Sequence, residues 1–169
     1  MRVGNKSYLF FSGTSYLGID QDVHYQSVLF DSIRRYGFSH GLSRVNNVRL
    51  KVFEEFEDFF SQKAKAEDAA VMSSGFLSGI TAVQYLHPRS DLCWAAPDTH
   101  PAILPQELKP DFQLNFIQWK KRCLEQSEQL SPRKILILGN AVDPLRAEIH
   151  DYAWVQELAK RHEVTLLID

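Results

Sequence analysis

Three polar groups, each at the end of an apolar run, have side chains suited to act together in one chemical site. The first is Ser73-Ser74-Gly75-Phe76, the second is Asp98-Thr99-His100, and the third is Asp169, which follows the run Val164-Thr-Leu-Leu-Ile. Near-continuous apolar runs are typical of strands in a parallel sheet that is covered on both faces. Because open α/β sheets bind ligands at the carboxyl ends of their strands, we expect the three groups to share one site.

Each group has both a functional and an ordinary structural explanation. Ser74 and Gly75 precede a predicted helix, whose first N–H groups would attract a phosphate, although a plain helix cap uses the same residues. His100 is suited to stack on a flat cofactor or to transfer protons, or it is a surface histidine. Asp169 is suited to pair with the pyridine nitrogen of pyridoxal phosphate, or it is a turn residue. Taken together, the functional roles are those of a pyridoxal phosphate site.

The composition disfavours several other classes of protein. Of the 169 residues, 44% are hydrophobic and 24% charged, with a net charge of −2 and a pI near 6.3. Without a basic excess we expect no nucleic-acid partner, and without a long apolar segment we expect neither membrane insertion nor a signal peptide. Cys93 and Cys123 form no metal motif and suit a reducing compartment, so a cytoplasmic location is expected. Neither a Gly-x-Gly-x-x-Gly after a strand nor a Gly-Lys-Ser/Thr is present, which disfavours a dinucleotide fold or a P-loop.

Hydrophobic periodicity predicts alternating strands and helices. We expect strands near residues 8–12, 69–73, 91–95, 112–117, 134–139 and 164–169, and helices over 24–36, 48–60, 75–86, 120–130 and 151–160. This order predicts an α/β fold with three layers, α/β/α, and a mainly parallel sheet. The aromatic stripe of the second helix, Val52, Phe53, Phe56, Phe59 and Phe60, is expected to pack in the core.

Six segments in the same order resemble those of a known family. They are Phe11-Ser-Gly-Thr-Ser-Tyr-Leu-Gly-Ile19, Tyr36-Gly37 with Ser43-Arg44, Phe56-Glu57, Ser74-Gly75-Phe76, His100-Pro-Ala-Ile103 and Leu166-Leu-Ile-Asp169. In these segments the chain resembles the α-oxoamine synthases, fold type I pyridoxal-phosphate enzymes related to class I/II aminotransferases. The resemblance implies an N-terminal arm and first helix over 1–36, with the residues to about Tyr16 reaching away from the core. It makes 37–169 the first part of a large cofactor-binding domain, apparently truncated because the chain ends inside an apolar run.

The resemblance also implies a cofactor, a reaction and partners. Ser74, Gly75 and Phe76 would hold pyridoxal 5'-phosphate, His100 would stack on its ring, and Asp169 would meet its pyridine nitrogen. The reaction would condense an amino acid with an acyl-CoA and release carbon dioxide. The protein would be a homodimer in which the loop Gly37–Asn47 crosses toward the other subunit's cofactor. Because fold does not determine function, an aminotransferase of the same fold and a lysine-less, non-catalytic partner subunit remain alternatives.

The chain also departs from the family pattern. Thr14 stands in place of an Asn, Phe53 in place of a His, and Asn46-Asn47-Val48 where a Gly is usual. The family's Ser-Met-Asp-Gly-Asp segment, whose serine approaches the cofactor, is replaced by Gly139-Asn-Ala-Val-Asp-Pro-Leu145, so Asn140 or Asp143 would take that corner. In the family the lysine that forms the Schiff base comes after the position of Asp169, and none of the lysines present stands in its motif.

Overall fold

The computed structural model describes residues 2–9, 14–15, 17–39, 41, 43–44, 50–143 and 145–169. The chain divides into two compact units, Met1–Phe59 and Phe60–Asp169. The boundary between them falls inside helix α2 (Lys51–Ala64). The division after residue 36 that the sequence suggested stays a prediction, as does the course of the arm up to Tyr16, a residue outside the described ones.

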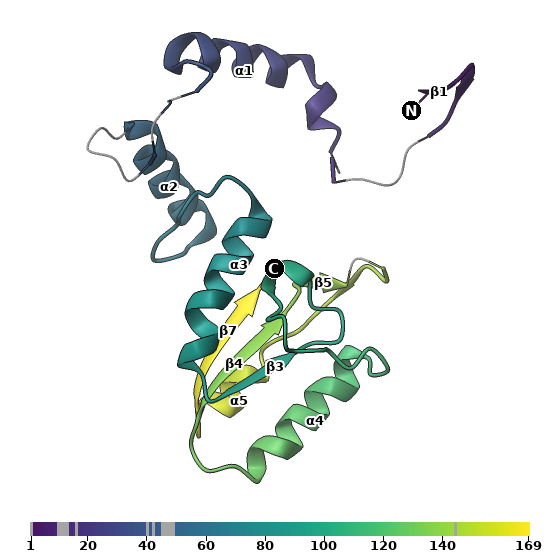
Figure 1. Ribbon diagram of the computed structural model, residues 1–169, viewed down its shortest axis with the longest axis vertical. Helices are drawn as coiled ribbons and strands as arrows, with labels where there is room; N and C mark the ends of the chain where they lie inside the picture. Colours follow the sequence, from purple (N-terminus) through teal and green to yellow (C-terminus); the bar gives the residue numbers. More distant parts are fainter. Residues whose placement is uncertain are drawn as a thin grey trace. The chain divides into compact units, whose positions relative to one another are not determined.

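The first unit contains a small hairpin and a long helix (Figure 1). Strands β1 (Arg2–Val3) and β2 (Lys6–Ser7) pair antiparallel, and the 3₁₀ turn η1 (Ile19–Gln21) precedes α1 (Val23–Tyr36). The Asp22 carboxylate caps α1 by accepting the N–H of Tyr25 at 2.7 Å. Gly37, with φ of 84°, ends it in a conformation that side chains disfavour. Tyr8 and Leu9 form no strand, and the rest of the strand expected over 8–12 lies outside the described residues.

The second unit contains the parallel sheet that the sequence predicted. Three strands lie in the order β3 (Leu92–Ala95), β4 (Lys134–Gly139) and β7 (Glu163–Ile168), and both pairings are parallel. The helical segments are α3 (Gly75–Leu86), η2 (His87–Arg89), η3 (Pro101–Ile103), α4 (Phe116–Glu128) and α5 (Val155–Ala159). A short hairpin, β5 (Val142–Asp143) with β6 (Glu148–Ile149), follows β4.

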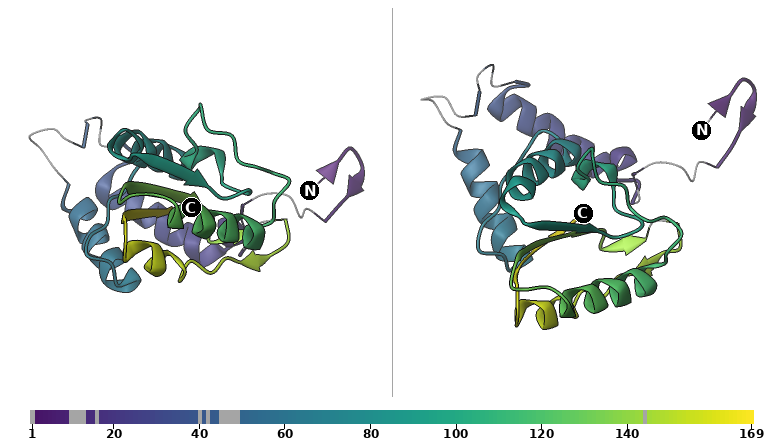
Figure 2. Two further views of the ribbon diagram at one scale, coloured as in Figure 1. Left: turned by 90° about the horizontal axis from the view of Figure 1, so that it is seen from below. Right: turned by 60° about the horizontal axis from the view of Figure 1, so that its bottom comes forward.

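Helices cover both faces of this sheet, so the fold is α/β with three layers (Figure 2). Successive side chains of a strand point to opposite faces, and β4 uses both faces for burial. Ile135 and Ile137 pack in a core cluster with Trp119 of α4 and Leu158 of α5. Leu136 and Leu138 pack in a second cluster with Val83 of α3 and Ile103 of η3.

Two of the predicted strands are wrong. Residues 69–73 are all described and form no strand, and Met72 is 42% exposed. A strand needs a neighbour for its backbone groups, and this segment joins neither edge of the three-stranded sheet. Residues 112–117 form a turn and then the start of α4, because Asn115 and Gln118 make a reciprocal capping box.

Other predicted elements are present with shifted ends. The helix expected over 120–130 begins earlier, at Phe116, and the one expected over 151–160 is shortened to Val155–Ala159. Asp151 does not cap that helix; its carboxylate accepts the Ala153 N–H at 2.8 Å in the preceding turn. The aromatic stripe of α2 is not buried as expected, since Phe56, Phe59 and Phe60 are 48%, 54% and 52% exposed.

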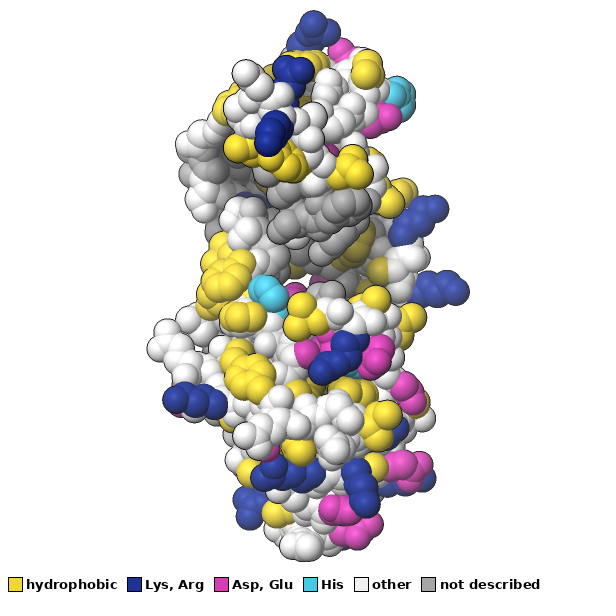
Figure 3. Space-filling view, turned by 90° about the vertical axis from the view of Figure 1, so that its right-hand side faces the viewer, with side chains coloured by type: hydrophobic (Ala, Val, Ile, Leu, Met, Phe, Trp, Pro, Cys, Tyr) yellow, Lys and Arg dark blue, Asp and Glu magenta, His cyan; other side chains and the backbone are white. Residues whose placement is uncertain are grey.

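The described surface carries charges of both signs. On the face drawn in Figure 3, Lys and Arg are interspersed with Asp and Glu, and hydrophobic side chains lie exposed between them. In the described part of the chain, no helix has both the length and the apolar character needed to cross a bilayer.

The cap of α4 leads to a stability prediction. The Asn115 Oδ1 accepts the Gln118 N–H at 2.9 Å, and this contact uses only the acceptor of the carboxamide. We expect Asn115→Ala to lower the free energy of unfolding by about 1 kcal/mol. Asn115→Asp keeps the acceptor, so its free energy of unfolding should be close to that of the parent. Urea unfolding followed by circular dichroism measures both, and equal losses in the two variants would contradict the capping role.

Candidate functional site

The candidate site lies where the three parallel strands end. Ala96, the residue after β3, is still hydrogen-bonded to β4, since its N–H donates to the Leu138 carbonyl at 2.8 Å. Asp169 follows β7 and is held to β4 through its own backbone. Its N–H donates to the Gly139 carbonyl at 3.0 Å, and its carbonyl accepts the Ala141 N–H at 2.9 Å. The parallel register therefore brings the segments after all three strands to the same edge of the sheet.

His100 and Asp169 are neighbours at this edge. The His100 Nδ1 lies 3.4 Å from the Asp169 Oδ2, and both side chains are partly exposed, at 49% and 41%. The same Nδ1 accepts the N–H of Ala102 at 3.1 Å and so caps η3. A nitrogen that accepts this bond cannot also donate to the carboxylate. In the neutral imidazole the proton is therefore assigned to Nε2, which leaves the Asp169 carboxylate beside His100 without a hydrogen bond from it.

The start of α3 lies next to His100. The rings of Phe76 and His100 are 6.4 Å apart between centroids and meet edge to face, at 79°. The Ser74 hydroxyl accepts the Leu77 N–H at 3.2 Å, which makes Ser74 the cap of α3. The first N–H groups of a helix, here those of Gly75 and Phe76, have no acceptor within the helix. A Cβ added to Gly75 would meet no atom within 4 Å, so the space on that side of Gly75 is open.

Gly79 allows α3 to approach the segment that carries His100. Gly79 is buried, and a Cβ there would lie 2.9 Å from the Ala102 carbonyl oxygen and 3.0 Å from a methyl group of Ile103. Real Cβ atoms do not come this close to a backbone oxygen. The glycine therefore sets the distance between α3 and η3, and with it the distance between Phe76 and His100.

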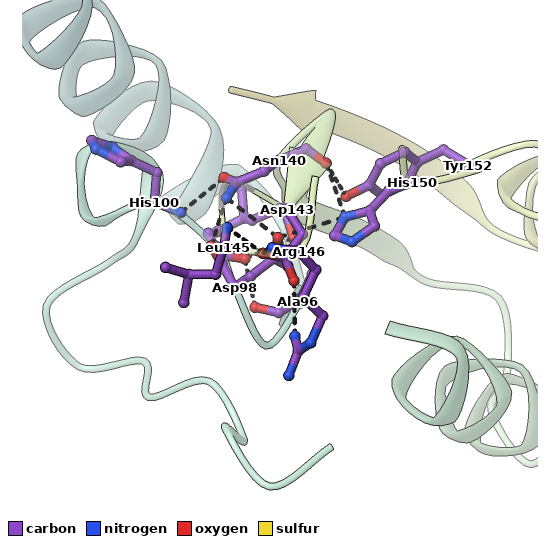
Figure 4. Close-up of polar contacts among 11 residues, drawn as sticks. Ala96, Asp98, His100, Asn140, Asp143, Leu145, Arg146, His150 and Tyr152 are labelled. Carbon is purple, nitrogen blue, oxygen red and sulfur yellow. Dashed lines mark hydrogen bonds and ion pairs between the residues drawn. The ribbon is translucent and has the colours of Figure 1, made fainter. Parts of the chain in front are cut away.

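Behind His100, a polar network surrounds Asn140 (Figure 4). The Asn140 Oδ1 accepts the backbone N–H of His100 at 3.0 Å, and its Nδ2 donates to the Asp98 carbonyl at 2.6 Å. The Asn140 carbonyl accepts the Tyr152 hydroxyl at 2.9 Å and lies 3.2 Å from the His150 Nδ1. In Figure 4 the imidazole of His100 points away from this network.

Asp98, Asp143 and His150 form a cluster whose ligand atoms all lie within 4.8 Å of one another. The Arg146 guanidinium donates to the Asp143 carboxylate at 2.8 Å. Burial alone would raise the pKa of Asp143, but hydrogen bonds from the Arg146 side chain and from the N–H groups of Leu145 and Arg146 hold it below its ordinary value. Asp143 therefore already has a cationic partner, whereas the Asp98 Oδ2 lies 3.6 Å from the His150 Nδ1.

The structure brings together Phe76, His100 and Asp169 and places Ser74 and Gly75 at the helix start beside them. Their role in holding a cofactor stays a prediction. The sequence left open whether Asn140 or Asp143 takes the place of the family's serine. In the structure the Asp143 carboxylate bonds Arg146, and the Asn140 side chain bonds the backbone of His100. Sequence reasoning missed Gly79, His150 and Tyr152. Of these three, only Gly79 could have been found from the sequence, because a glycine inside an apolar helix suggests a close approach of another backbone.

The chain is similar to several curated proteins named 8-amino-7-oxononanoate synthase. No protein-family profile matches the chain. It is 26% identical over 102 residues to the 8-amino-7-oxononanoate synthase of Lysinibacillus sphaericus, covering 60% of this chain and 26% of that enzyme. It is 22% and 24% identical to the enzymes of that name from Petrotoga mobilis and Herminiimonas arsenicoxydans, covering 100% of this chain and 44% of each. The chain is thus similar to proteins named 8-amino-7-oxononanoate synthase, and it spans less than half the length of these curated relatives.

The close approach at Gly79 can be tested by adding one methyl group. Ala favours a helix by about 1 kcal/mol over Gly, but a clash with backbone in a packed core costs about 1–3 kcal/mol. We expect Gly79→Ala to be destabilising overall, whereas Thr81→Ala, at an exposed position of the same helix, should be neutral or stabilising. Thermal unfolding of both variants is the measurement. A Gly79→Ala variant as stable as Thr81→Ala would show that α3 and η3 are not in this contact.

Proposed function

We propose that this chain is the first part of the cofactor-binding domain of a pyridoxal-phosphate-dependent acyltransferase. By analogy with 8-amino-7-oxononanoate synthase, the enzyme would condense an amino acid with an acyl-CoA and release carbon dioxide. The observation that carries the proposal is the Asp169 carboxylate beside the edge of the His100 imidazole, at the carboxyl ends of parallel strands. The similarity to named synthases over the whole chain supports it.

The residues at the sheet edge fit the cofactor's ring. The His100 imidazole would stack on the cofactor's flat ring, and the Asp169 carboxylate, whose Oδ2 lies 3.4 Å from the His100 Nδ1, would be the partner of the ring nitrogen. That carboxylate takes no hydrogen bond from the neutral imidazole, because Nδ1 already accepts the Ala102 N–H. It is therefore available to a protonated ring nitrogen, and a buried or half-buried charge-assisted bond of this kind is among the stronger hydrogen bonds in proteins.

The start of α3 fits the cofactor's phosphate. The helix has 12 residues, and its positive end carries the unpaired N–H groups of Gly75 and Phe76. The absence of a side chain at Gly75 leaves the open space that an anion would enter. Phe76 links the two parts of the site, because its ring meets the His100 ring edge to face.

The chain's own residues would each have a distinct task. Pyridoxal phosphate, when bound, supplies an electron-withdrawing ring that stabilises negative charge at the α-carbon of an amino acid. The Asp169 carboxylate would keep the proton on the ring nitrogen, the His100 imidazole would hold the ring in plane, and Ser74, Gly75 and Phe76 would secure the phosphate end. No lysine of this chain stands in the family's lysine motif, so covalent attachment would depend on residues beyond Asp169.

Replacing one carboxylate oxygen tests the ring-nitrogen contact. In the full-length protein, Asp169→Asn should weaken pyridoxal phosphate binding about 10- to 100-fold, because a hydrogen bond to a charged group contributes about 1.5–3 kcal/mol. Asp151→Asn is the matched control, since the Asp151 carboxylate only accepts a backbone N–H in a turn. Absorbance titration with pyridoxal phosphate gives both affinities. Equal affinities in the two variants would refute the role of Asp169.

Activity assays of the full-length protein distinguish the acyltransferase from the two alternatives. An acyltransferase should release free CoA when given an amino acid and an acyl-CoA, and a thiol reagent follows that release. Amino-group transfer to a keto acid without CoA release would indicate the aminotransferase alternative. Cofactor binding without either reaction would indicate a non-catalytic partner subunit.

We also propose that the full-length protein is a homodimer. The aromatic stripe of α2 supports this, because Phe56 and Phe59 are about half exposed, and an apolar stripe of this kind is usually covered by another surface. Light scattering at micromolar concentration should give twice the monomer mass. A monomer that binds the cofactor fully would rule out a site shared between subunits.

A further inference from the structure

The carboxamide of Asn140 makes the two hydrogen bonds that a backbone peptide unit would make in a parallel sheet. In a parallel pair, one residue donates its N–H to the carbonyl before its partner residue and accepts the N–H that follows it. The Asn140 side chain does the same around Thr99. Its Nδ2 donates to the Asp98 carbonyl at 2.6 Å, and its Oδ1 accepts the His100 N–H at 3.0 Å.

This side chain takes over where the backbone ladder stops. The last backbone bond between the two segments runs from the Ala96 N–H to the Leu138 carbonyl at 2.8 Å. The Thr99 hydroxyl donates to the Ala96 carbonyl at 2.7 Å and lies 3.2 Å from the Leu138 carbonyl, and it ties the turn to the same strand end. Further along this segment, the Asp98 carbonyl and the His100 N–H meet the Asn140 carboxamide.

We propose that Asn140 is a positioning residue of the site: its carboxamide replaces a peptide unit of β4 and extends the β3–β4 ladder to His100, which fixes the imidazole beside Asp169. The consequence for cofactor binding rests on the proposed function. Asp169 is held to β4 by backbone bonds to Gly139 and Ala141, the residues on either side of Asn140. The end of β4 therefore holds both His100 and Asp169 in place.

The contacts require a carboxamide in particular. Asn140 is 7% exposed, so its polar atoms need protein partners, and it uses a donor and an acceptor at once. Its Nδ2 also lies 3.4 Å from the Asp98 Oδ2. An aspartate of the same shape would keep the acceptor, lose the donor, and place a second carboxylate against Asp98.

Asn140 is itself held from behind. Its carbonyl accepts the Tyr152 hydroxyl, which remains a donor because burial, and then the charge of Asp98, raise the pKa of Tyr152 above its ordinary value. The His150 Nδ1 lies 3.2 Å from the same carbonyl, which assigns a proton to that nitrogen. The His150 ring stacks on Phe116 of α4, at 4.0 Å between centroids and 8° between planes. Two side chains of the segment after β6, His150 and Tyr152, thus fix the backbone that carries the carboxamide, and Phe116 of α4 packs against one of them.

The test compares one isosteric change at two positions of the full-length protein. Asn140→Asp removes a donor that is used, whereas Asn115→Asp removes a donor that the α4 cap does not use. Asn115→Ala is a third variant that loses stability far from the site. Amide hydrogen exchange, measured without cofactor, gives the exchange rate of the His100 N–H relative to the Leu136 N–H in the central strand. Titration with pyridoxal phosphate gives the affinity.

In Asn140→Asp the acceptor for the His100 N–H is kept, but the lost donor and the repulsion from Asp98 should displace the side chain from His100. We therefore expect the relative exchange of the His100 N–H to increase about tenfold and pyridoxal phosphate binding to weaken by a similar factor. Both Asn115 variants should leave the two quantities unchanged, whatever their thermal midpoints. If Asn140→Asp lowers the midpoint while the exchange ratio stays that of the parent, Asn140 has only a structural role and the proposal fails. If the parent itself does not bind pyridoxal phosphate, the proposed function fails, and the exchange ratio still decides whether Asn140 positions His100.

Discussion

The pairing of β4 with a parallel strand on each side is the interaction on which the rest of this structure depends. Leu136, Ile137 and Leu138 are fully buried, since β4 lies in the middle of the sheet and is covered by α3 on one face and by α4 and α5 on the other. The pairings run in register from Lys134 to Gly139 along β7 and from Ile135 to Leu138 along β3. With both neighbours in register, all three strands end at one level. A shift of one residue would turn the buried side chains of β4 to the opposite face.

The candidate site lies at the edge of the sheet where the three strands end, and its polar groups have two different roles. Parallel strands end with unpaired backbone groups, and here a side-chain amide, a hydroxyl and the backbone of Asp169 satisfy them. The groups that point outward are then the His100 imidazole and the Asp169 carboxylate, which are both partly exposed. The polar atoms that face inward act as supports, and those that face outward remain available to a ligand. This separation explains why a dense polar network can lie beside an accessible site.

The apolar surface of the described chain has a different physical meaning. Phe76, Leu77 and Tyr85 of α3 are 54%, 46% and 60% exposed, and three phenylalanines of α2, Phe56, Phe59 and Phe60, are similarly exposed. Apolar stripes on amphipathic helices gain most of their stabilisation when another layer covers them. The chain spans less than half the length of its curated relatives. The exposed apolar side chains of α3 and α2 therefore contribute less stabilisation here than they would if another layer covered them.

The sequence alone determined the elements whose signals are local. The continuous apolar runs of β4 and β7 and the helical spacing of apolar residues over 75–86 identified the type and much of the extent of these elements, since periodicity reflects which faces are buried. It failed at residues 69–73, because strand formation depends on a neighbour, and at 112–117, where the Asn115–Gln118 capping box outweighed an apolar stretch. For the site, the residue types and their order named His100 and Asp169 as candidates. Only the tertiary structure decided that they touch, that Gly79 sets the approach of α3, and that Asn140 holds His100, because each of these depends on distances between segments far apart in the chain.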